Sequence, residues 1–319
     1  MVTIKDIAKI AGVGVSTVSR ALNGGAKVDK ATFQKIIEAA KKLKYKPNYA
    51  ARDLVRGNFS KKAVGVVLPV IAHPFFFEVV RGIYDALLEG DYNIMLFNTS
   101  RDREEVFSFI IREGLAGIIF VSEGLSEVEK NTLEINQYHY ILIDHHQKNT
   151  MSFYIDNEFG GMTAARYLIS QNCESIGYIG ESIDTQQQND RFGGFKDELK
   201  RNNREILIDE RIPMDEKFSY QSTQFLVEKY PDLDGLFYFC DKLAYGGQKA
   251  VREKGKEIKI IGYDDMPSSV YLDLTTIRQP AYEIGYEGSK VLLNMFKAGY
   301  SEGQEKQYRL LPELQVRKS

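Results

Sequence analysis

Four polar side chains lie close together near the N-terminus, at Ser16, Thr17, Ser19 and Arg20. Their chemistry suits a nucleic acid, because short hydroxyl groups donate hydrogen bonds to phosphates and an arginine binds guanine through two parallel hydrogen bonds. Such contacts require that the four side chains project from one rigid element. The local sequence VSTVSRALN predicts this element as a short helix, which opens after Gly14 and stops at the next Asn-Gly-Gly.

Two more helices are predicted around this one. Thr3 is placed to cap a helix that Gly12 ends, and Asp29 to cap a third helix whose apolar residues form a single stripe. Three short helices with a tight glycine turn between the first two are typical of a helix-turn-helix, which places its second helix in the major groove of DNA. A small helical bundle that binds another protein is the alternative.

The formal charge is distributed unevenly along the chain. Residues 1–62 contain eleven lysines and three arginines against four acidic residues, which gives this segment a net charge of +10. Because the whole chain carries −2, the remaining 257 residues carry −12. Such a division indicates a polyanion partner for the basic segment. Together with the helical pattern it favours double-stranded DNA over a solvated basic tail.

These segments also resemble a known family. TIKDIAKIAGVGVSTVSRALNG and KYKPNYAARDLVRG look like the lactose/galactose repressor (LacI/GalR) family of bacterial transcription factors, apart from Gly14, where the family usually has serine. The resemblance implies that Val15, Ser16 and Arg20 contact bases. The residues that it places on phosphates are Thr17, Ser19, Asn23 and Tyr45.

The segment PNYAARDLVRGN follows the predicted helix-turn-helix. Pro47 suits the first turn of a helix and Gly57 its end, but about ten residues are too few for a stable isolated helix in water. The resemblance implies a hinge helix that pairs with its copy in the minor groove. Leu54 then wedges between base pairs, and Asn48 and Arg52 contact the DNA. A plain linker is the alternative.

From residue 63 onward, short apolar runs alternate with amphipathic helical stretches. Strands are predicted at 63–69, 92–98, 117–121, 140–144, 152–156, 175–180, 235–240 and 258–263. Helices are predicted at about 76–89, 104–113, 126–137, 157–171, 190–202, 219–229 and 241–254. Repeated strand–helix units in two series predict an α/β fold of two lobes, each a doubly wound parallel sheet. The resemblance identifies this part with the periplasmic-binding-protein-like fold.

The predicted organisation has three parts. They are a helix-turn-helix domain over 1–46, a hinge over 47–60, and an effector-binding and dimerisation domain over 61–319. The resemblance places the first lobe at about 61–155 and 281–310 and the second at about 156–280 and 311–319. A homodimer is expected to bind a pseudo-palindromic operator, with a small effector between the lobes controlling DNA affinity through the hinge.

Ligands of doubly wound sheets bind at the carboxyl ends of the strands, so candidate contacts are residues that follow predicted strands. Aromatic side chains there can stack on a sugar ring, Arg191 is a planar donor at the start of a predicted helix, and Asp264 is an acceptor. An ion pair would be a purely structural role for Arg191. The predicted effector residues, most of them implied by the resemblance, are Phe75, Phe76, Asp144, His145, Arg191, Phe218, Cys240 and Asp264.

Two departures from the family pattern bear on the ligand. Purine-responsive members have an arginine where this chain has Thr185, and sugar-responsive members often have a better hydrogen-bonding residue than Cys240. A sugar or sugar phosphate is therefore favoured over a purine. The neighbouring Asp241 and Asp265 are explained as caps of the elements that follow them.

Several classes of protein are disfavoured by what the sequence lacks. It contains no G-x-S-x-G, P-loop or H-E-x-x-H motif, and two cysteines with four scattered histidines suggest no metal cage, so neither catalysis nor a cofactor is expected. The absence of a secretory signal or a long apolar run predicts a cytoplasmic protein without a membrane segment. Two alternatives remain open: a global carbon-catabolite regulator switched by a phosphocarrier protein, and a sugar-binding transport component.

Overall fold

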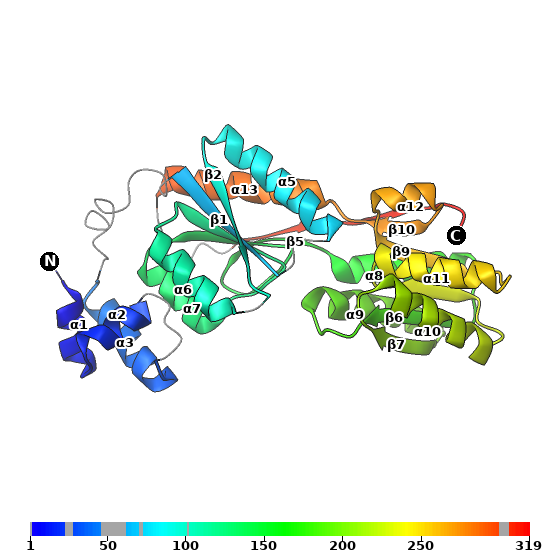
Figure 1. The fold of residues 1–319 in the computed structure, drawn as a ribbon, viewed down its shortest axis with the longest axis horizontal. Coiled ribbons are helices and arrows are strands. Elements are labelled where there is room, and N and C mark those ends of the chain that lie inside the picture. The colour runs from blue at the N-terminus through cyan, green and yellow to red at the C-terminus, as the bar shows by residue number, and fades with distance from the viewer. Residues whose placement is uncertain (1, 23–27, 46–61, 70–72, 101, 300–305) are drawn as a thin grey trace. The chain divides into compact units, whose positions relative to one another are not determined.

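The computed structural model forms two compact units (Figure 1). It describes residues 2–22, 28–45, 62–69, 73–100, 102–299 and 306–319. Unit 1 comprises residues 1–154 and 281–308, and unit 2 comprises residues 155–280 and 309–319. The chain therefore passes from one unit to the other three times. Among the described helices, none is both long enough and apolar enough to cross a membrane.

The first three helices of unit 1 form the predicted helix-turn-helix. They are α1 (Ile4–Ala11), α2 (Val15–Leu22) and α3 (Lys30–Lys42). The backbone N–H and the hydroxyl of Thr3 both donate to the Asp6 carboxylate, which fixes the start of α1. Gly12 ends α1 with a φ of +67°, a conformation that favours glycine. Asp29 caps α3 by accepting a hydrogen bond from the Thr32 N–H at 3.0 Å.

The rest of unit 1 is a six-stranded sheet in the order β11-β5-β4-β3-β1-β2. Its strands are β1 (Ala63–Leu68), β2 (Asn93–Asn98), β3 (Gly117–Val121), β4 (His139–Ile143), β5 (Met151–Ile155) and β11 (Lys306–Leu310). The helices are α5 (Pro74–Glu89), α6 (Arg103–Glu113), α7 (Glu127–Ile135) and α13 (Ala281–Ala298). β1, β3 and β4 lie inside the sheet and pair in parallel, which explains their nearly continuous apolar sequences.

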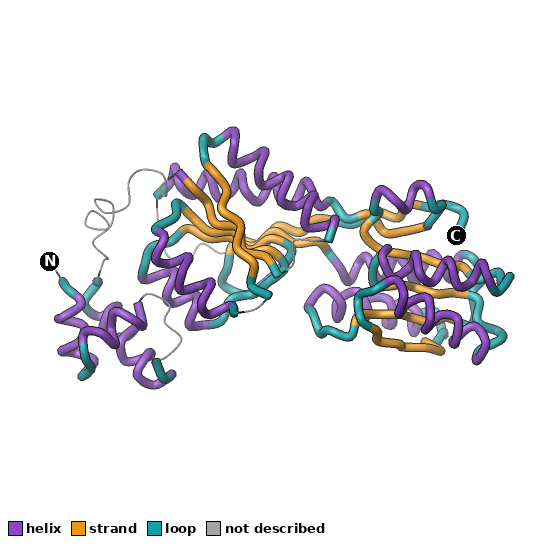
Figure 2. The backbone as a smooth tube through the Cα atoms, viewed as in Figure 1, coloured by secondary structure: helices purple, strands orange, loops and turns teal. Residues whose placement is uncertain are grey.

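Unit 2 repeats this plan with the strand order β12-β10-β9-β8-β6-β7. Its strands are β6 (Ile176–Glu181), β7 (Ile206–Ile212), β8 (Gly235–Tyr238), β9 (Lys259–Asp264), β10 (Thr275–Arg278) and β12 (Glu313–Gln315). The helices are α8 (Asn157–Ser170), α9 (Gln186–Arg201), α10 (Glu216–Lys229), α11 (Asp241–Glu253) and α12 (Pro267–Tyr271). All pairs are parallel except β10 with β12. Helices cover both faces of the sheet (Figure 2), so the predicted α/β class with doubly wound sheets is confirmed.

Two glycines allow α8 and α9 to approach each other closely. A Cβ atom at Gly161 would collide with the carbonyl oxygen of Arg191, and one at Gly194 would collide with that of Glu158. Both positions therefore require glycine if the helix backbones are to touch. This packing fixes α9, the helix that carries Arg191, against the first helix of unit 2.

Two helices begin three or four residues earlier than the sequence predicts. α9 starts at Gln186 instead of residue 190, because the Thr185 hydroxyl caps it by accepting the Gln188 N–H at 3.2 Å. Arg191 consequently lies in the second turn and not at the start of the helix. α10 starts at Glu216 instead of residue 219, so Phe218 lies within the first turn of α10 and not in the loop after a strand.

Candidate nucleic-acid and small-molecule sites

The second helix of the helix-turn-helix has one buried and one exposed face. Val18, Ala21 and Leu22 pack into the core of this domain, whereas Ser16 and Arg20 are exposed. Val15 opens the helix with 40% of its surface exposed. The residues predicted to contact bases thus share the exposed face of α2, where an apolar side chain suits a thymine methyl group.

The described residues that are predicted to contact phosphates are less exposed than those predicted to contact bases. Thr17 and Ser19 are half-buried at the edge of the exposed face, and Tyr45 packs against the core of the three helices. Arg20 directs its Nε toward the carbonyl oxygen of Ser16 at 3.4 Å. The predicted contacts Asn23, Asn48, Arg52 and Leu54, and with them the predicted hinge, lie outside the described residues.

At the carboxyl edge of the unit 2 sheet, the guanidinium of Arg191 is held in a fixed orientation. Arg191 is only 4% exposed. Its Nε donates to Asn157 Oδ1 at 2.7 Å and its Nη1 to the carbonyl oxygen of Phe239 at 2.9 Å. The guanidinium also stacks on the ring of Tyr263 at 3.7 Å from the centroid. These partners are neutral, so they position the charge without an opposing carboxylate.

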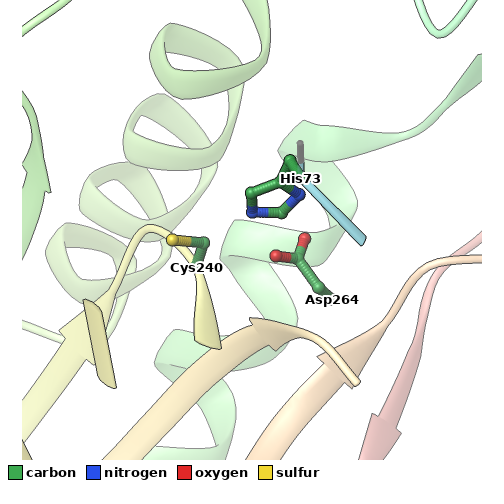
Figure 3. A group of neighbouring side chains, drawn as sticks. All are labelled: His73, Cys240 and Asp264. Atoms are coloured by element: carbon green, nitrogen blue, oxygen red, sulfur yellow. The ribbon is translucent and has the colours of Figure 1, made fainter. Parts of the chain in front are cut away.

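Asp264 and Cys240 belong to the same edge of this sheet. Asp264 is the last residue of β9, and Cys240 lies between β8 and α11 (Figure 3). An oxygen of the Asp264 carboxylate lies within 4.8 Å of the Cys240 Sγ. Burial, and secondarily the charge of Asp264, raise the pKa of the Cys240 thiol, so this cysteine is a neutral group. His73, also drawn in Figure 3, is part of unit 1 and caps α5 by accepting the Phe75 N–H.

The half-buried carboxylate of Asp264 has a specific partner that the sequence did not suggest. Gln279, one residue beyond β10, donates its Nε2 to Asp264 Oδ1 at 2.6 Å. Asn157, which orients Arg191, likewise follows β5 by two residues. Asn157 directly follows the predicted strand 152–156, so the rule used for Asp264 would have found it, whereas Gln279 follows β10, which was not among the predicted strands.

Two aspartates have roles other than the capping predicted for them. Asp241 is fully buried, and its carboxylate accepts hydrogen bonds from Met266, Ser269 and Thr276. Asp265 forms an ion pair with Arg317 at 2.7 Å. Capping is therefore the wrong explanation for both, because their partners come from other elements of unit 2.

The predicted effector residues of unit 1 lie at the carboxyl edge of its own sheet. Asp144 is buried and accepts the Ser122 hydroxyl at 2.5 Å. Burial, with smaller effects of His146 and Arg103, lowers the pKa of His145 to about 4, so this imidazole is neutral at physiological pH.

The two predicted aromatic residues of unit 1 lie in the first turn of α5. Phe75 is buried, Phe76 is half-buried, and their rings meet edge to face with centroids 5.4 Å apart. By contrast, Phe218 of unit 2 is 49% exposed. An aromatic ring is therefore more accessible in α10 than at the buried Phe75.

Comparison with known proteins identifies relatives of both parts of the chain. A family model described as "Bacterial regulatory proteins, lacI family" matches residues 3–48. A second, described as "Periplasmic binding protein-like domain", matches residues 165–319. The ribose operon repressor of Halalkalibacterium halodurans is 30% identical over 308 residues, which cover 93% of this chain and 91% of that protein.

Solved structures show the same fold. A LacI family transcriptional regulator from Enterococcus faecium with bound ribose has a TM-score of 0.72 and 26% identity, and the match covers 80% of this chain and 97% of that one. The lac repressor dimer bound to operator and the anti-inducer ONPF has a TM-score of 0.73 and 22% identity, with 99% and 98% of the two chains covered. The second match extends over the helix-turn-helix as well as both sheets.

Proposed function

Because the chain belongs to the lacI family of bacterial regulatory proteins, we propose that it is a transcriptional repressor whose operator affinity is controlled by a sugar. The ligand binds at the carboxyl edge of the unit 2 sheet, where Arg191 and Asp264 provide the polar contacts. Ribose is the first sugar to test, since a relative is named a ribose operon repressor and a structural neighbour holds bound ribose.

One observation carries this proposal: Arg191 is buried, yet its guanidinium is fixed by neutral groups. Arg191 donates to the carbonyl oxygen of Phe239, which directly precedes Cys240, and the Asp264 carboxylate lies within 4.8 Å of the Cys240 Sγ, so donor and acceptor converge on one region of the edge. A sugar hydroxyl both donates and accepts hydrogen bonds. It can therefore accept from an arginine while it donates to a carboxylate, a pairing that an apolar or purely anionic ligand would not use.

The helix-turn-helix supports the DNA-binding half of the proposal. In this proposal Val15, Ser16 and Arg20, which are exposed, contact base edges, and Thr17, Ser19 and Tyr45 contact phosphates. The net charge of +10 over residues 1–62 adds an attraction to any duplex, which weakens with salt. Arg20→Ala should reduce discrimination at one base pair by about 1–3 kcal/mol, whereas losing a lysine should weaken binding to all duplexes alike.

The assembly and location follow from the same proposal. A homodimer would place one helix-turn-helix on each half of a palindromic operator. The regulator would act in the cytoplasm, where its DNA lies, without catalysing a reaction. We retain 1–46 as the DNA-binding domain, 47–60 as the hinge and 61–319 as the effector-binding part.

The test begins with the operator, which is selected from a random duplex library with the purified full-length protein. Its affinity is then measured by fluorescence anisotropy with D-ribose, other mono- and disaccharides, sugar phosphates and a purine. Because the chain has no tryptophan, direct sugar binding is measured by isothermal titration calorimetry. We expect one sugar to bind and to change operator affinity about 5–150-fold.

Two variants separate the sugar site from the DNA-binding function. Arg191→Lys and Asp264→Asn should bind the operator normally and no longer respond to the sugar concentration that saturates the native protein. If no duplex is preferred over random competitor, the DNA-binding proposal fails. If a purine alone changes operator affinity, or a phosphorylated carrier protein is required, the sugar-effector proposal fails.

A further inference from the structure

The turn that follows β9 has an unusual backbone. Asp264 has a φ of +120° and Asp265 a φ of +56°, both in the region that favours glycine. Residues with a Cβ atom remain in such conformations only where their surroundings force them to, and these residues cluster at ligand-binding sites. Groups elsewhere in unit 2 must therefore hold this turn in place.

The buried carboxylate of Asp241 is the group that holds it. Asp241 Oδ2 accepts the backbone N–H of Met266 at 2.8 Å. Asp241 Oδ1 accepts the hydroxyl of Thr276 at 2.5 Å. The Thr276 oxygen in turn accepts the backbone N–H of Asp265 at 3.3 Å. The two amides that follow β9 are thus tied to one carboxylate, one directly and one through a hydroxyl.

The surroundings of Asp241 suit a carboxylate specifically. The Ser269 hydroxyl also donates to Oδ2, at 2.5 Å, so the backbone and hydroxyl groups bound to both oxygens are donors. A Cβ atom at Gly262 would collide with Oδ1, so the neighbouring strand leaves room for it only as glycine. Burial, and secondarily the charge of Asp264, raise the pKa of Asp241 above its usual range, although the hydrogen bonds from Ser269 and Thr276 oppose this shift.

The carboxylate of Asp264 is oriented by this turn. Gln279 donates to one of its oxygens at 2.6 Å. The Asp265 side chain is anchored separately, because it pairs with Arg317 at 2.7 Å, and Arg317 also donates to the carbonyl oxygen of Leu274 at 2.8 Å. The side chains of the turn are therefore restrained by β10 and the C-terminal segment, and its backbone amides by Asp241.

We propose that Asp241 is a positioning residue for ligand binding, whose buried carboxylate holds the 264–266 turn so that Asp264 is presented to the ligand. Asp241 touches no ligand and acts through the backbone of its neighbours. The inference rests on the proposed function for the identity of the ligand. The role of Asp241 in holding the turn is independent of that identity.

Hydrogen exchange in the full-length protein tests the turn itself. Asp241→Asn keeps the shape of the side chain but places an amide group against donors. We expect the amides of Asp265 and Met266 to exchange at least about tenfold faster, which corresponds to about 1.4 kcal/mol. β6 and β8 should keep their protection. Unchanged exchange at 265–266, or an equal increase throughout unit 2, would overturn the proposal.

Asp234→Asn is the matched control at the other edge of the same sheet. The Asp234 carboxylate accepts the N–H groups of Glu174 and Ser175 at 2.8 and 2.9 Å. Its loss should speed exchange at 174–175 and leave 265–266 unaffected. D-ribose affinity, measured by calorimetry, should fall about tenfold in Asp241→Asn and stay unchanged in Asp234→Asn, and operator affinity without sugar should be unchanged in both. Equal losses of ribose affinity in the two variants would contradict a positioning role.

A glycine substitution provides a rescue test. Glycine adopts a φ of +56° without strain, so the turn should depend less on Asp241 in the Asp265→Gly background. There, adding Asp241→Asn should speed exchange at Met266 by less than about threefold. An undiminished effect would show that Asp241 does not act by holding a strained backbone. If the native protein fails to bind D-ribose, the proposed ligand is wrong, and the two exchange results still decide the role of Asp241.

Discussion

Arg103 lies at the carboxyl edge of the unit 1 sheet and Arg191 at that of the unit 2 sheet, and the two guanidinium groups have different kinds of partner. In unit 1, Arg103 pairs with the carboxylates of Glu123 and Glu129, and it also donates to the carbonyl oxygen of Gly124 at 2.7 Å. In unit 2, Arg191 is held by an amide oxygen, a peptide carbonyl and aromatic rings. The first arrangement satisfies the charge within the unit, whereas the second positions a charge for another group. An arginine at the carboxyl edge of a sheet is therefore a strong recognition candidate when it is held in place without an ion-pair partner.

The aspartates at the two edges differ in the same way. Asp144 of unit 1 is buried and bound to Ser122, so its charge stabilises a local turn. Asp264 of unit 2 is half-buried, and its φ of +120° lies further from the left-handed helical region than the φ of +56° of Asp144. A strained backbone conformation persists only where the surrounding structure holds it, and such residues cluster at functional sites. This comparison predicts that substitutions in unit 2 affect ligand binding and the matched substitutions in unit 1 affect stability.

The largest effect is expected for the two arginines. Arg191→Met should reduce sugar affinity by at least about 100-fold, because a charged hydrogen bond contributes about 1.5–3 kcal/mol and the ligand group would then face an apolar side chain. Arg103→Met should instead lower the free energy of unfolding by about 2–3 kcal/mol, since it leaves two partly buried carboxylates unpaired. Calorimetry and urea denaturation measure the two quantities. A loss of sugar affinity in Arg103→Met would break the comparison.

The two aspartates should show the same division with a smaller effect. Asp264→Asn is expected to lower sugar affinity by about 1.5–2 kcal/mol and to leave stability nearly unchanged, because asparagine has the same backbone requirements and nearly the same shape as aspartate. Asp144→Asn should cost about 1 kcal/mol of stability through its hydrogen bond with Ser122. Titration of both variants with the same sugar tests this, and equal affinity losses would place Asp144 in the ligand site as well.

The part of the pH dependence of stability that arises from histidine should be confined to unit 1. All four histidines lie in its segments, and the pKa of His145 is lowered to about 4 from 6.5. Between these values the unfolded chain binds a proton that the folded unit excludes, so the free energy of unfolding falls as the pH falls. The loss by pH 4 is at most about 2 kcal/mol after allowance for partial exposure.

Hydrogen exchange at several pH values measures this effect in each unit separately. His145→Gln should flatten the pH dependence of unit 1 between pH 4 and 6.5, and its effect should be small near pH 8. If His145→Gln reduced the pH dependence of stability equally in unit 2, which contains no histidine, the effect could not be assigned to the surroundings of His145.

The sequence predicted the fold best where burial is continuous. The apolar runs of β1, β3 and β8 and the capped helices of the helix-turn-helix could be recognised from local pattern alone. β7 was missed because it lies at the edge of its sheet and has charged, exposed residues within it. Helix starts were misplaced at α9 and α10, where Thr185 and Asp215 cap earlier than the apolar periodicity begins.

For the site, the sequence identified residues that act at strand ends but not the partners that orient them. Arg191 and Asp264 follow from their position and chemistry. The role of Asp241 depends on Thr276, which is 35 residues away, and no local spacing reveals such a contact. Capping was a reasonable local explanation for Asp241, and it was wrong because the fold brings β10 and α12 to that carboxylate.

The smallest effect is expected for the exposed aromatic residues. Phe218 in α10 is 49% exposed and Phe77 in α5 is 66% exposed, so neither contributes much to the core. If Phe218 stacks on the sugar, Phe218→Ala should lower its affinity by about 0.5–1.5 kcal/mol, which is roughly 2–10-fold. Phe77→Ala is the control of matched chemistry in unit 1 and should leave the affinity unchanged. Both variants should unfold at nearly the native urea concentration, because each removes a ring that already faces solvent. An affinity loss in Phe77→Ala but not in Phe218→Ala would assign the stacking surface to unit 1 and confine the role of unit 2 to polar recognition.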